Sequence, residues 1–154
     1  LARHVATTEP NGALELLFDA LVQNPHALVL HQAIWQTLSQ NNIPILAMRD
    51  TPWLVRRSQP FFPADCLADG GNGISCGIRR ADVLSRTNPT ETWVARFPLQ
   101  KPLDMSDAVC RRDVCRAVEG NVLLYHDSHH ISKTYMRTMA NELGRQIGAA
   151  TRWW

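Results

Sequence analysis

The sequence has no apolar run that approaches the roughly 20 consecutive residues needed to cross a bilayer. Its first ten residues, LARHVATTEP, also lack the basic region and the apolar core of a secretory signal peptide. We therefore expect a soluble chain, with any export signal or membrane anchor lying outside it.

Charge of one sign is not concentrated anywhere along the chain. The 16 basic and 14 acidic residues are scattered, and the formal net charge is only +2. This distribution indicates neither a nucleic-acid partner nor a basic face for a membrane surface. No internal repeat is present, and 154 residues with 45% hydrophobic content can bury one ordinary core, so a single domain over residues 1–154 is expected.

Cysteine is scarce, but the four cysteines form two local pairs, Cys66 with Cys76 and Cys110 with Cys115. Four cysteines allow three pairings, and closing each short loop locally is the simplest of them. Such disulfides require an oxidising compartment. A zinc site is disfavoured because the tight C-x-x-C spacing is missing, and free thiols are the other alternative.

Apolar periodicity predicts helices alternating with strands. Two helices, broken near Pro25, are expected over 12–41, and a core-packed helix is expected over 133–148 with Ser132 as its N-cap. The other predicted elements are buried strands at 43–48 and 121–125, extended segments at 92–97 and 103–105, and a short helix at 79–86. This order favours an α/β sheet with helices on both faces.

Two stretches are expected to be loop excursions. Residues 51–78 combine three prolines with a Gly-Gly-Asn-Gly cluster, a density of breakers that predicts no regular element. Residues 106–120 contain the second cysteine pair and are interpreted in the same way.

The stretch Tyr125-His126-Asp127-Ser128-His129-His130-Ile131-Ser132 follows the second predicted strand. An aspartate and a histidine three positions apart, between a strand and a helix, can place the carboxylate against the imidazole Nδ1. Asp127 would then orient His130, whose Nε2 would take a proton from a serine hydroxyl. Acyl transfer through a serine ester requires this proton transfer and its later reversal.

The order of these features resembles the SGNH hydrolases, whose last motif block carries such an Asp and His pair. Residues 43–146 are similar to the SGNH domain fused to integral-membrane acyltransferases that O-acetylate exported glycans. Besides the Asp127 and His130 block, the similarity rests on Arg49-Asp50-Thr51-Pro52, the two cysteine pairs, the Leu103-Asp104 step, Gly120-Asn121-Val122 and the opening Leu1-Ala2-Arg3.

This resemblance implies a three-layer α/β/α SGNH fold with a flavodoxin-like sheet. It also implies that an acyl group, expected to be acetyl, passes from a membrane acyltransferase domain to a serine and then to the hydroxyl of a carbohydrate acceptor. The reaction would take place on the periplasmic or cell-envelope face of the membrane. Asp127 and His130 are the expected catalytic residues, and neither a cofactor nor a metal is expected.

The sequence departs from the family pattern at the nucleophile. SGNH enzymes carry their serine in a Gly-Asp-Ser block near the start of the domain, and no such block occurs here. We also find no assignable glycine or asparagine for the oxyanion hole. The fold is therefore expected to lack its N-terminal strand, which predicts an inactive chain that aggregates or is only marginally stable by itself.

Several alternatives stay open at this point. The cluster of His126, Asp127, His129 and His130 could bind zinc, copper or nickel, or could be a solvated loop without chemistry. A carbohydrate esterase would use the same pair with water as acceptor, and a non-catalytic binding module would keep only the fold. Further possible sugar or anion contacts lie at Asp50, Arg56, Arg57, Trp153 and Trp154, each with a structural role as the simpler interpretation.

Overall fold

The computed structural model describes residues 28–152. The first helix expected within 12–41, the opening Leu1-Ala2-Arg3 and the pair Trp153 and Trp154 lie outside the described residues. The chain divides into two compact units, Leu1–Leu46 with Trp93–Lys101 and Ala47–Thr92 with Pro102–Trp154. The expectation of one domain over the whole chain stays a prediction.

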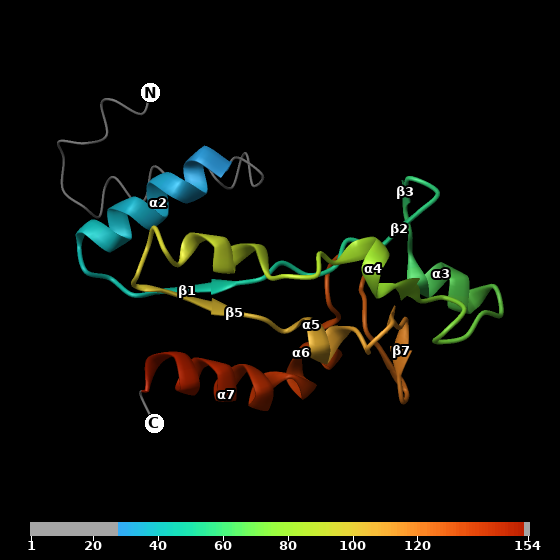
Figure 1. Cartoon of the computed structure of the whole chain (residues 1–154). Helices are drawn as coiled ribbons and strands as arrows, with labels where there is room; N and C mark the ends of the chain where they lie inside the picture. Colours follow the sequence, from blue (N-terminus) through green and yellow to red (C-terminus); the bar gives the residue numbers. More distant parts are fainter. Residues whose placement is uncertain (1–27, 153–154) are drawn as a thin grey trace. The chain divides into compact units, whose positions relative to one another are not determined.

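In the first unit, the helix α2 (Leu28–Gln40) is the second of the two helices expected over 12–41 (Figure 1). Ile34 is buried, and the Trp35 ring lies edge-on to Trp93 and Phe97, with centroid distances of 5.9 and 5.8 Å. Edge-to-face aromatic pairs of this kind stabilise a core beyond their area alone. The periodic pattern of the sequence therefore placed this helix correctly.

The extended segment expected at 92–97 is wrong. A 3-10 helix, η2 (Pro89–Trp93), covers its start, and the backbone N–H groups of Arg96 and Phe97 both donate to the Trp93 carbonyl. The buried side chain of Asn88 accepts a hydrogen bond from the Thr90 backbone N–H at 3.0 Å. Local bonds of this type compete with strand pairing, which explains the turn.

The strands β1 (Ile45–Met48) and β5 (Gln100–Leu103) form a two-stranded sheet (Figure 1). The backbone N–H of Ile45 donates to Leu99, and that of Arg49 donates to Leu103, at the same sequence offset. This constant offset is the pattern of parallel strands. The strand predicted at 43–48 is thus confirmed for its second part, whereas the extended segment predicted at 103–105 is displaced, because β5 ends at Leu103.

Three antiparallel pairs of short strands belong to the second unit. They are β2 (Val55–Arg56) with β3 (Gln59–Pro60), β4 (Ile78–Arg79) with β6 (Val114–Cys115), and β7 (Val118–Glu119) with β8 (Val122–Leu123). Arg57 and Ser58 both have positive φ angles, 53° and 62°, as a two-residue hairpin turn of the primed type requires. The strand predicted at 121–125 is shorter than expected: β8 forms a hairpin with β7, and the buried residues Leu124 and Tyr125 follow it.

The expectation that residues 51–78 hold no regular element is wrong. They contain the first hairpin, the start of β4 and the helix α3 (Pro63–Ala68). Pro63 stands in the first turn of α3, where the missing N–H costs no helical hydrogen bond. Leu54 and Ile78 are buried in the core, so both ends of this stretch contribute to packing.

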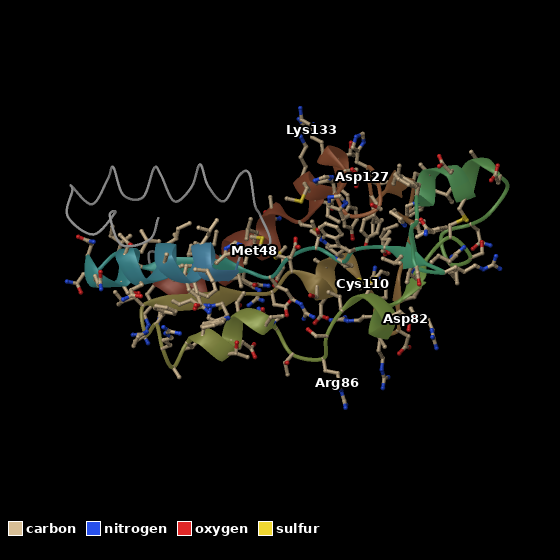
Figure 2. All side chains as sticks on the ribbon, turned by 90° about the horizontal axis from the view of Figure 1, so that it is seen from above. Met48, Asp82, Arg86, Cys110, Asp127 and Lys133 are labelled. Atoms are coloured by element: carbon tan, nitrogen blue, oxygen red, sulfur yellow. A yellow bond between two sulfur atoms is a disulfide. The ribbon has the colours of Figure 1, made fainter. Side chains whose placement is uncertain are left out.

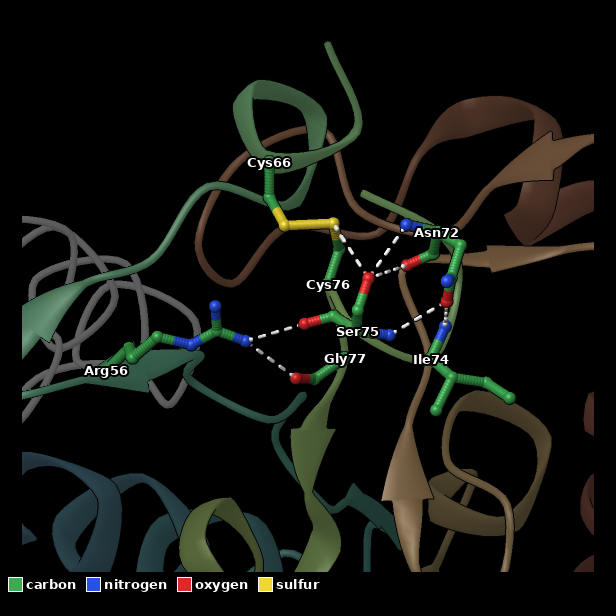
Figure 3. Close-up of a disulfide and its surroundings, with 7 residues drawn as sticks. All are labelled: Arg56, Cys66, Asn72, Ile74, Ser75, Cys76 and Gly77. Atoms are coloured by element: carbon green, nitrogen blue, oxygen red, sulfur yellow. Dashed lines mark hydrogen bonds between the residues drawn. A yellow bond between two sulfur atoms is a disulfide. The ribbon is translucent and has the colours of Figure 1, made fainter. Parts of the chain in front are cut away.

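The disulfide between Cys66 and Cys76 joins α3 to the turn that precedes β4 (Figure 3). The Asn72 side-chain carbonyl accepts from the backbone N–H groups of Ile74 and Ser75, each at 2.9 Å, and thereby shapes this turn. A Cβ on Gly71 would lie 2.2 Å from the Cys76 sulfur. Only glycine fits there without a shift of the disulfide.

The helix predicted at 133–148 consists of two helices, α6 (Lys133–Thr138) and α7 (Ala140–Thr151), which meet at Met139 (Figure 1). The Ser132 hydroxyl accepts from the Tyr135 backbone N–H at 3.2 Å, so the predicted N-cap is confirmed. Met139 is buried in the core of the second unit, and Tyr135 and Leu143 pack against this core. The predicted apolar face is therefore confirmed, although the helix is interrupted.

Two further helices are short. α4 (Arg80–Val83) lies within the helix predicted at 79–86. The expectation that residues 106–120 form a loop excursion is wrong, because they contain α5 (Ser106–Val109) and the strands β6 and β7. The described residues thus combine helices with sheets of two strands each. A mixed α and β composition agrees with the expected class, and the three-layer arrangement stays a prediction. No helix in the described part is long and apolar enough to span a membrane.

Candidate active site

The Asp127 and His130 motif lies on a tight loop between Tyr125 and Ile131, which form an antiparallel bridge. The backbone N–H of His126 donates to the His130 carbonyl at 2.7 Å and closes the loop. Ser132 anchors its far end, because its backbone N–H donates to the Leu124 carbonyl at 2.7 Å. Tyr125 is fully buried, so the loop starts from a fixed point in the core.

Within this loop, the Nδ1 of His130 lies 2.6 Å from the Oδ2 of Asp127. The other carboxylate oxygen, Oδ1, accepts from the backbone N–H groups of His129 at 2.9 Å and His130 at 2.8 Å. The His129 backbone N–H and the His130 side chain hold the pKa of Asp127 well below its ordinary value. The carboxylate is therefore ionised and fixed in place, with the imidazole against it.

The two members of this pair differ in exposure. The Asp127 side chain is 28% exposed, whereas that of His130 is 65% exposed. Because Nδ1 faces the carboxylate, Nε2 lies on the opposite side of a largely exposed ring. This geometry presents a proton acceptor to a group outside the loop, as a general base must.

His129 and Ser128 lie beside the pair without replacing either member. The Nδ1 of His129 is 3.2 Å from the Ser128 hydroxyl and 3.5 Å from Asp127 Oδ1. Ser128 therefore contacts His129, not His130. The imidazole of His126 is exposed, and no contact of its side chain with Asp127 is found within the described residues.

Sequence reasoning did not find the segment that holds this loop from outside, the residues after β1. The Thr51 hydroxyl donates to the His129 carbonyl at 2.7 Å, and the Leu54 backbone N–H donates to the Ser128 carbonyl at 2.7 Å. The Trp53 indole stacks on the His129 ring with a centroid distance of 4.4 Å and an interplanar angle of 19°. The His129 ring in turn lies 3.9 Å from that of His130.

Asp50, noted in the sequence as a possible ligand contact, shapes this segment. Its carboxylate accepts from the Thr51 backbone N–H at 2.8 Å and from the Trp53 indole N–H at 3.1 Å. An aspartate that bonds to its following residues is typical of a loop-forming position. The simpler, structural interpretation of Asp50 therefore has direct contacts in its favour.

Arg49 and Asp104, both part of the family resemblance, meet at the end of β1. Arg49 is only 8% exposed, and its Nη1 lies 3.0 Å from Asp104 Oδ2. The side chain of Gln146 binds the backbone of Asp104 on both sides, accepting from its N–H at 2.9 Å and donating to its carbonyl at 2.7 Å. Burial raises the pKa of Asp104, but hydrogen bonds from Ser106 and Arg49 outweigh it and lower that pKa overall.

The arginines proposed as anion contacts separate into two cases. Arg56 donates to the backbone carbonyls of Ser75 at 3.1 Å and Gly77 at 3.0 Å (Figure 3). Its guanidinium also covers the Phe61 ring, at 3.9 Å from the ring centroid. Its role is therefore structural. Arg57 is exposed in the hairpin turn.

A metal ion could be held by part of the histidine cluster. One ligand atom each of Asp127, His129 and His130 lie within 4.8 Å of one another. Imidazole and carboxylate suit zinc, copper or nickel.

Both disulfides have the predicted local pairing, Cys66 with Cys76 and Cys110 with Cys115.

The family model described as the SGNH domain (fused to AT3 domains) matches residues 19–145. This chain belongs to that SGNH family. No curated protein and no solved structure matches the chain. The match to the family model confirms the SGNH resemblance seen in the sequence.

Membership in the SGNH family indicates acyl-transfer or esterase-type chemistry. Fusion to AT3 domains indicates a membrane acyltransferase partner and a membrane-associated protein. The two disulfides agree with an oxidising compartment outside the cytoplasm.

Proposed function

We propose that this SGNH domain transfers an acyl group, expected to be acetyl, to a carbohydrate hydroxyl outside the cytoplasm. Asp127 and His130 supply the acid–base pair, and the nucleophilic serine lies outside this chain. The observation that carries the proposal is the 2.6 Å contact between His130 Nδ1 and Asp127 Oδ2, together with the 65% exposure of the His130 side chain. A free polar loop has no need of this arrangement.

In the first half of the reaction, Asp127 keeps the proton of the neutral imidazole on Nδ1. The lone pair of Nε2 then accepts the proton of the serine hydroxyl while the serine oxygen attacks the acyl carbonyl. The carboxylate stabilises the imidazolium that forms. When the tetrahedral intermediate collapses, His130 returns the proton to the leaving group of the donor, and the acyl group stays on serine as an ester.

The second half reverses the proton transfer. His130 Nε2 takes a proton from the sugar hydroxyl, whose oxygen attacks the ester carbonyl. The serine oxygen leaves and recovers the proton from the imidazolium. One base therefore serves both half-reactions, and Asp127 orients it in each.

A carbohydrate esterase is the second candidate, and the exposure of His130 favours it. With a side chain 65% exposed, the base can activate water as well as a sugar hydroxyl. The two functions differ only in the acceptor. They are distinguished by offering the acylated enzyme a carbohydrate and measuring how the acyl group divides between sugar and water.

The proposal is tested with the extended protein, meaning this chain lengthened upstream to include any Gly-Asp-Ser block that precedes it. Hydrolysis of p-nitrophenyl acetate is measured for the wild type and for His130→Ala. We expect His130→Ala to lower kcat/KM about a thousandfold or more. His126→Ala removes a neighbouring, exposed imidazole from the same loop and should leave the rate unchanged.

Circular dichroism of each variant shows whether the fold is retained. Equal rates for wild type and folded His130→Ala protein would overturn the proposal and favour a binding module or a metal site. The 154-residue chain by itself is expected to show no turnover, because the serine is missing.

A further inference from the structure

A second site is formed by a cavity of about 340 Å³ whose lining is strongly basic. Four arginines line it, Arg79, Arg80, Arg86 and Arg112, against a single lining carboxylate, that of Asp113. Such a concentration of guanidinium groups contrasts with the even distribution of charge along the sequence. The cavity belongs entirely to the second compact unit.

The walls of this cavity are held by backbone and covalent contacts. Arg79 pairs with Val114 across the antiparallel strands β4 and β6, and the Arg80 backbone N–H donates to the Asp113 carbonyl at 2.9 Å. The disulfide between Cys110 and Cys115 closes the loop that carries Arg112. Arg79, Arg80 and Arg112 are therefore presented from a fixed frame, which reduces the entropy lost when a ligand binds.

Two of the four arginines have their charge compensated. Arg79 Nε lies 2.9 Å from Asp82 Oδ2, and Arg80 Nη1 lies 2.6 Å from Asp107 Oδ1. Arg80 also donates to the Cys110 carbonyl at 3.3 Å, so it helps to build the wall.

Arg86 and Arg112 are different, because both are exposed and neither forms an ion pair with any residue that the structure describes. Figure 2 shows the Arg86 side chain extending away from the ribbon, on the side opposite to Asp127. Two uncompensated guanidinium groups thus line one cavity, away from the catalytic pair.

We propose that this cavity, named here the arginine pocket, binds a phosphate group. A guanidinium presents a planar fork of N–H donors that matches phosphate oxygens in a bidentate geometry, and two such groups can hold one anion from two sides. The phosphate can belong to a phosphorylated glycan in solution or to a lipid headgroup at the membrane. The inference does not depend on the catalytic role of Asp127 and His130.

The extended protein defined above is titrated with inorganic phosphate at constant ionic strength, because the 154-residue chain is expected to be only marginally stable by itself, and binding is followed by calorimetry. The test variant is Arg86→Gln with Arg112→Gln, which removes the two uncompensated charges and leaves the wall contacts of Arg79 and Arg80 in place. The control is Arg137→Gln, an exposed arginine of α6 outside the pocket. Circular dichroism confirms that each variant is folded.

We expect saturable binding by the wild type and the control, and an affinity loss of about tenfold or more in the double variant. The proposal is overturned if the wild type shows no saturable binding, or if the double variant binds phosphate as tightly as the wild type.

A vesicle arm identifies the source of the phosphate group. Sedimentation compares vesicles of phosphatidylcholine alone with vesicles that also contain phosphatidic acid. Co-sedimentation that requires phosphatidic acid and is lost in the double variant assigns the pocket to lipid headgroups. Arginine-dependent binding of inorganic phosphate without vesicle binding assigns it to a soluble phosphorylated ligand.

Discussion

The Thr51 hydroxyl donates a hydrogen bond of 2.7 Å to the backbone carbonyl of His129, across 78 positions of the sequence. It connects the segment after β1 to the loop that carries Asp127 and His130. A second hydrogen bond joins the same two segments, from the Leu54 backbone N–H to the Ser128 carbonyl. Asp127 and His130 are therefore held from two sides, by the short-range bonds of their own loop and by a segment distant in the sequence.

Thr51→Val tests this connection, because valine keeps the shape of threonine and removes the hydroxyl. We expect the free energy of unfolding to fall by about 1 kcal/mol. We also expect a several-fold lower kcat in the extended protein, since the His130 loop is held less firmly. Thr134→Val, an exposed site of α6, is the matched control for urea unfolding and for p-nitrophenyl acetate hydrolysis. Unchanged stability and kcat in Thr51→Val would show that this hydrogen bond neither stabilises the fold nor positions the His130 loop.

Replacement of tyrosine by phenylalanine should affect the free energy of unfolding differently at Tyr125 and at Tyr135. The hydroxyl of the fully buried Tyr125 has no hydrogen-bond partner within the described residues, whereas that of Tyr135 donates to the Ala108 carbonyl at 2.6 Å. Tyr125→Phe should leave the free energy of unfolding unchanged or raise it by up to about 1 kcal/mol, because an unsatisfied polar group is removed. Tyr135→Phe should lower it by about 1 kcal/mol. Urea unfolding measures both, and a large loss for Tyr125→Phe would reveal a partner.

Acid should weaken the Asp127 loop in a defined direction. The pKa of this carboxyl lies below its ordinary value of 3.8 in the folded protein, so its contribution to stability is complete above about pH 4 and is lost as the pH falls through the folded pKa. Asp127→Asn should therefore cost about 1 kcal/mol at neutral pH and progressively less in acid. Unfolding curves of both proteins between pH 7 and pH 3 test this, and a difference that grows in acid contradicts it.

The disulfide between Cys66 and Cys76 should stabilise the chain more than the disulfide between Cys110 and Cys115. The loops that they close span sequence separations of 10 for Cys66 and Cys76 and 5 for Cys110 and Cys115. Loop-closure entropy predicts that the free energy of unfolding falls by about 3 kcal/mol when the disulfide of the longer loop is removed, and by about 2 kcal/mol for the shorter loop. Replacing each pair by alanines and measuring urea unfolding tests the order. Identical unfolding of wild type and both variants would mean that neither bond constrains the unfolded chain.

The features that the sequence predicted correctly depend on residues close to one another in the chain. The contact between Asp127 and His130 spans three positions, the disulfides close short loops, and the apolar face of α6 and α7 follows a helical period. Each of these can be derived from local spacing.

The features that the sequence missed depend on distant contacts or on competition between local ones. Thr51 and Trp53 could not be assigned to the site because their partner His129 lies far along the chain. The turn at 92–97 was mistaken for an extended segment because Asn88 bonds locally to the start of η2. The helix α3 was missed because Pro63 was counted as a breaker, although it stands at the start of the helix, where proline is favoured.

A double-mutant cycle on kcat shows whether Asp127 and His130 act as one unit in catalysis. The extended protein is compared with Asp127→Asn, His130→Ala and the double variant in the hydrolysis of p-nitrophenyl acetate. If Asp127 acts only by orienting His130, each single substitution lowers kcat and the double variant is no slower than His130→Ala alone. Losses that multiply in the double variant would contradict the account, because the two side chains would then act independently.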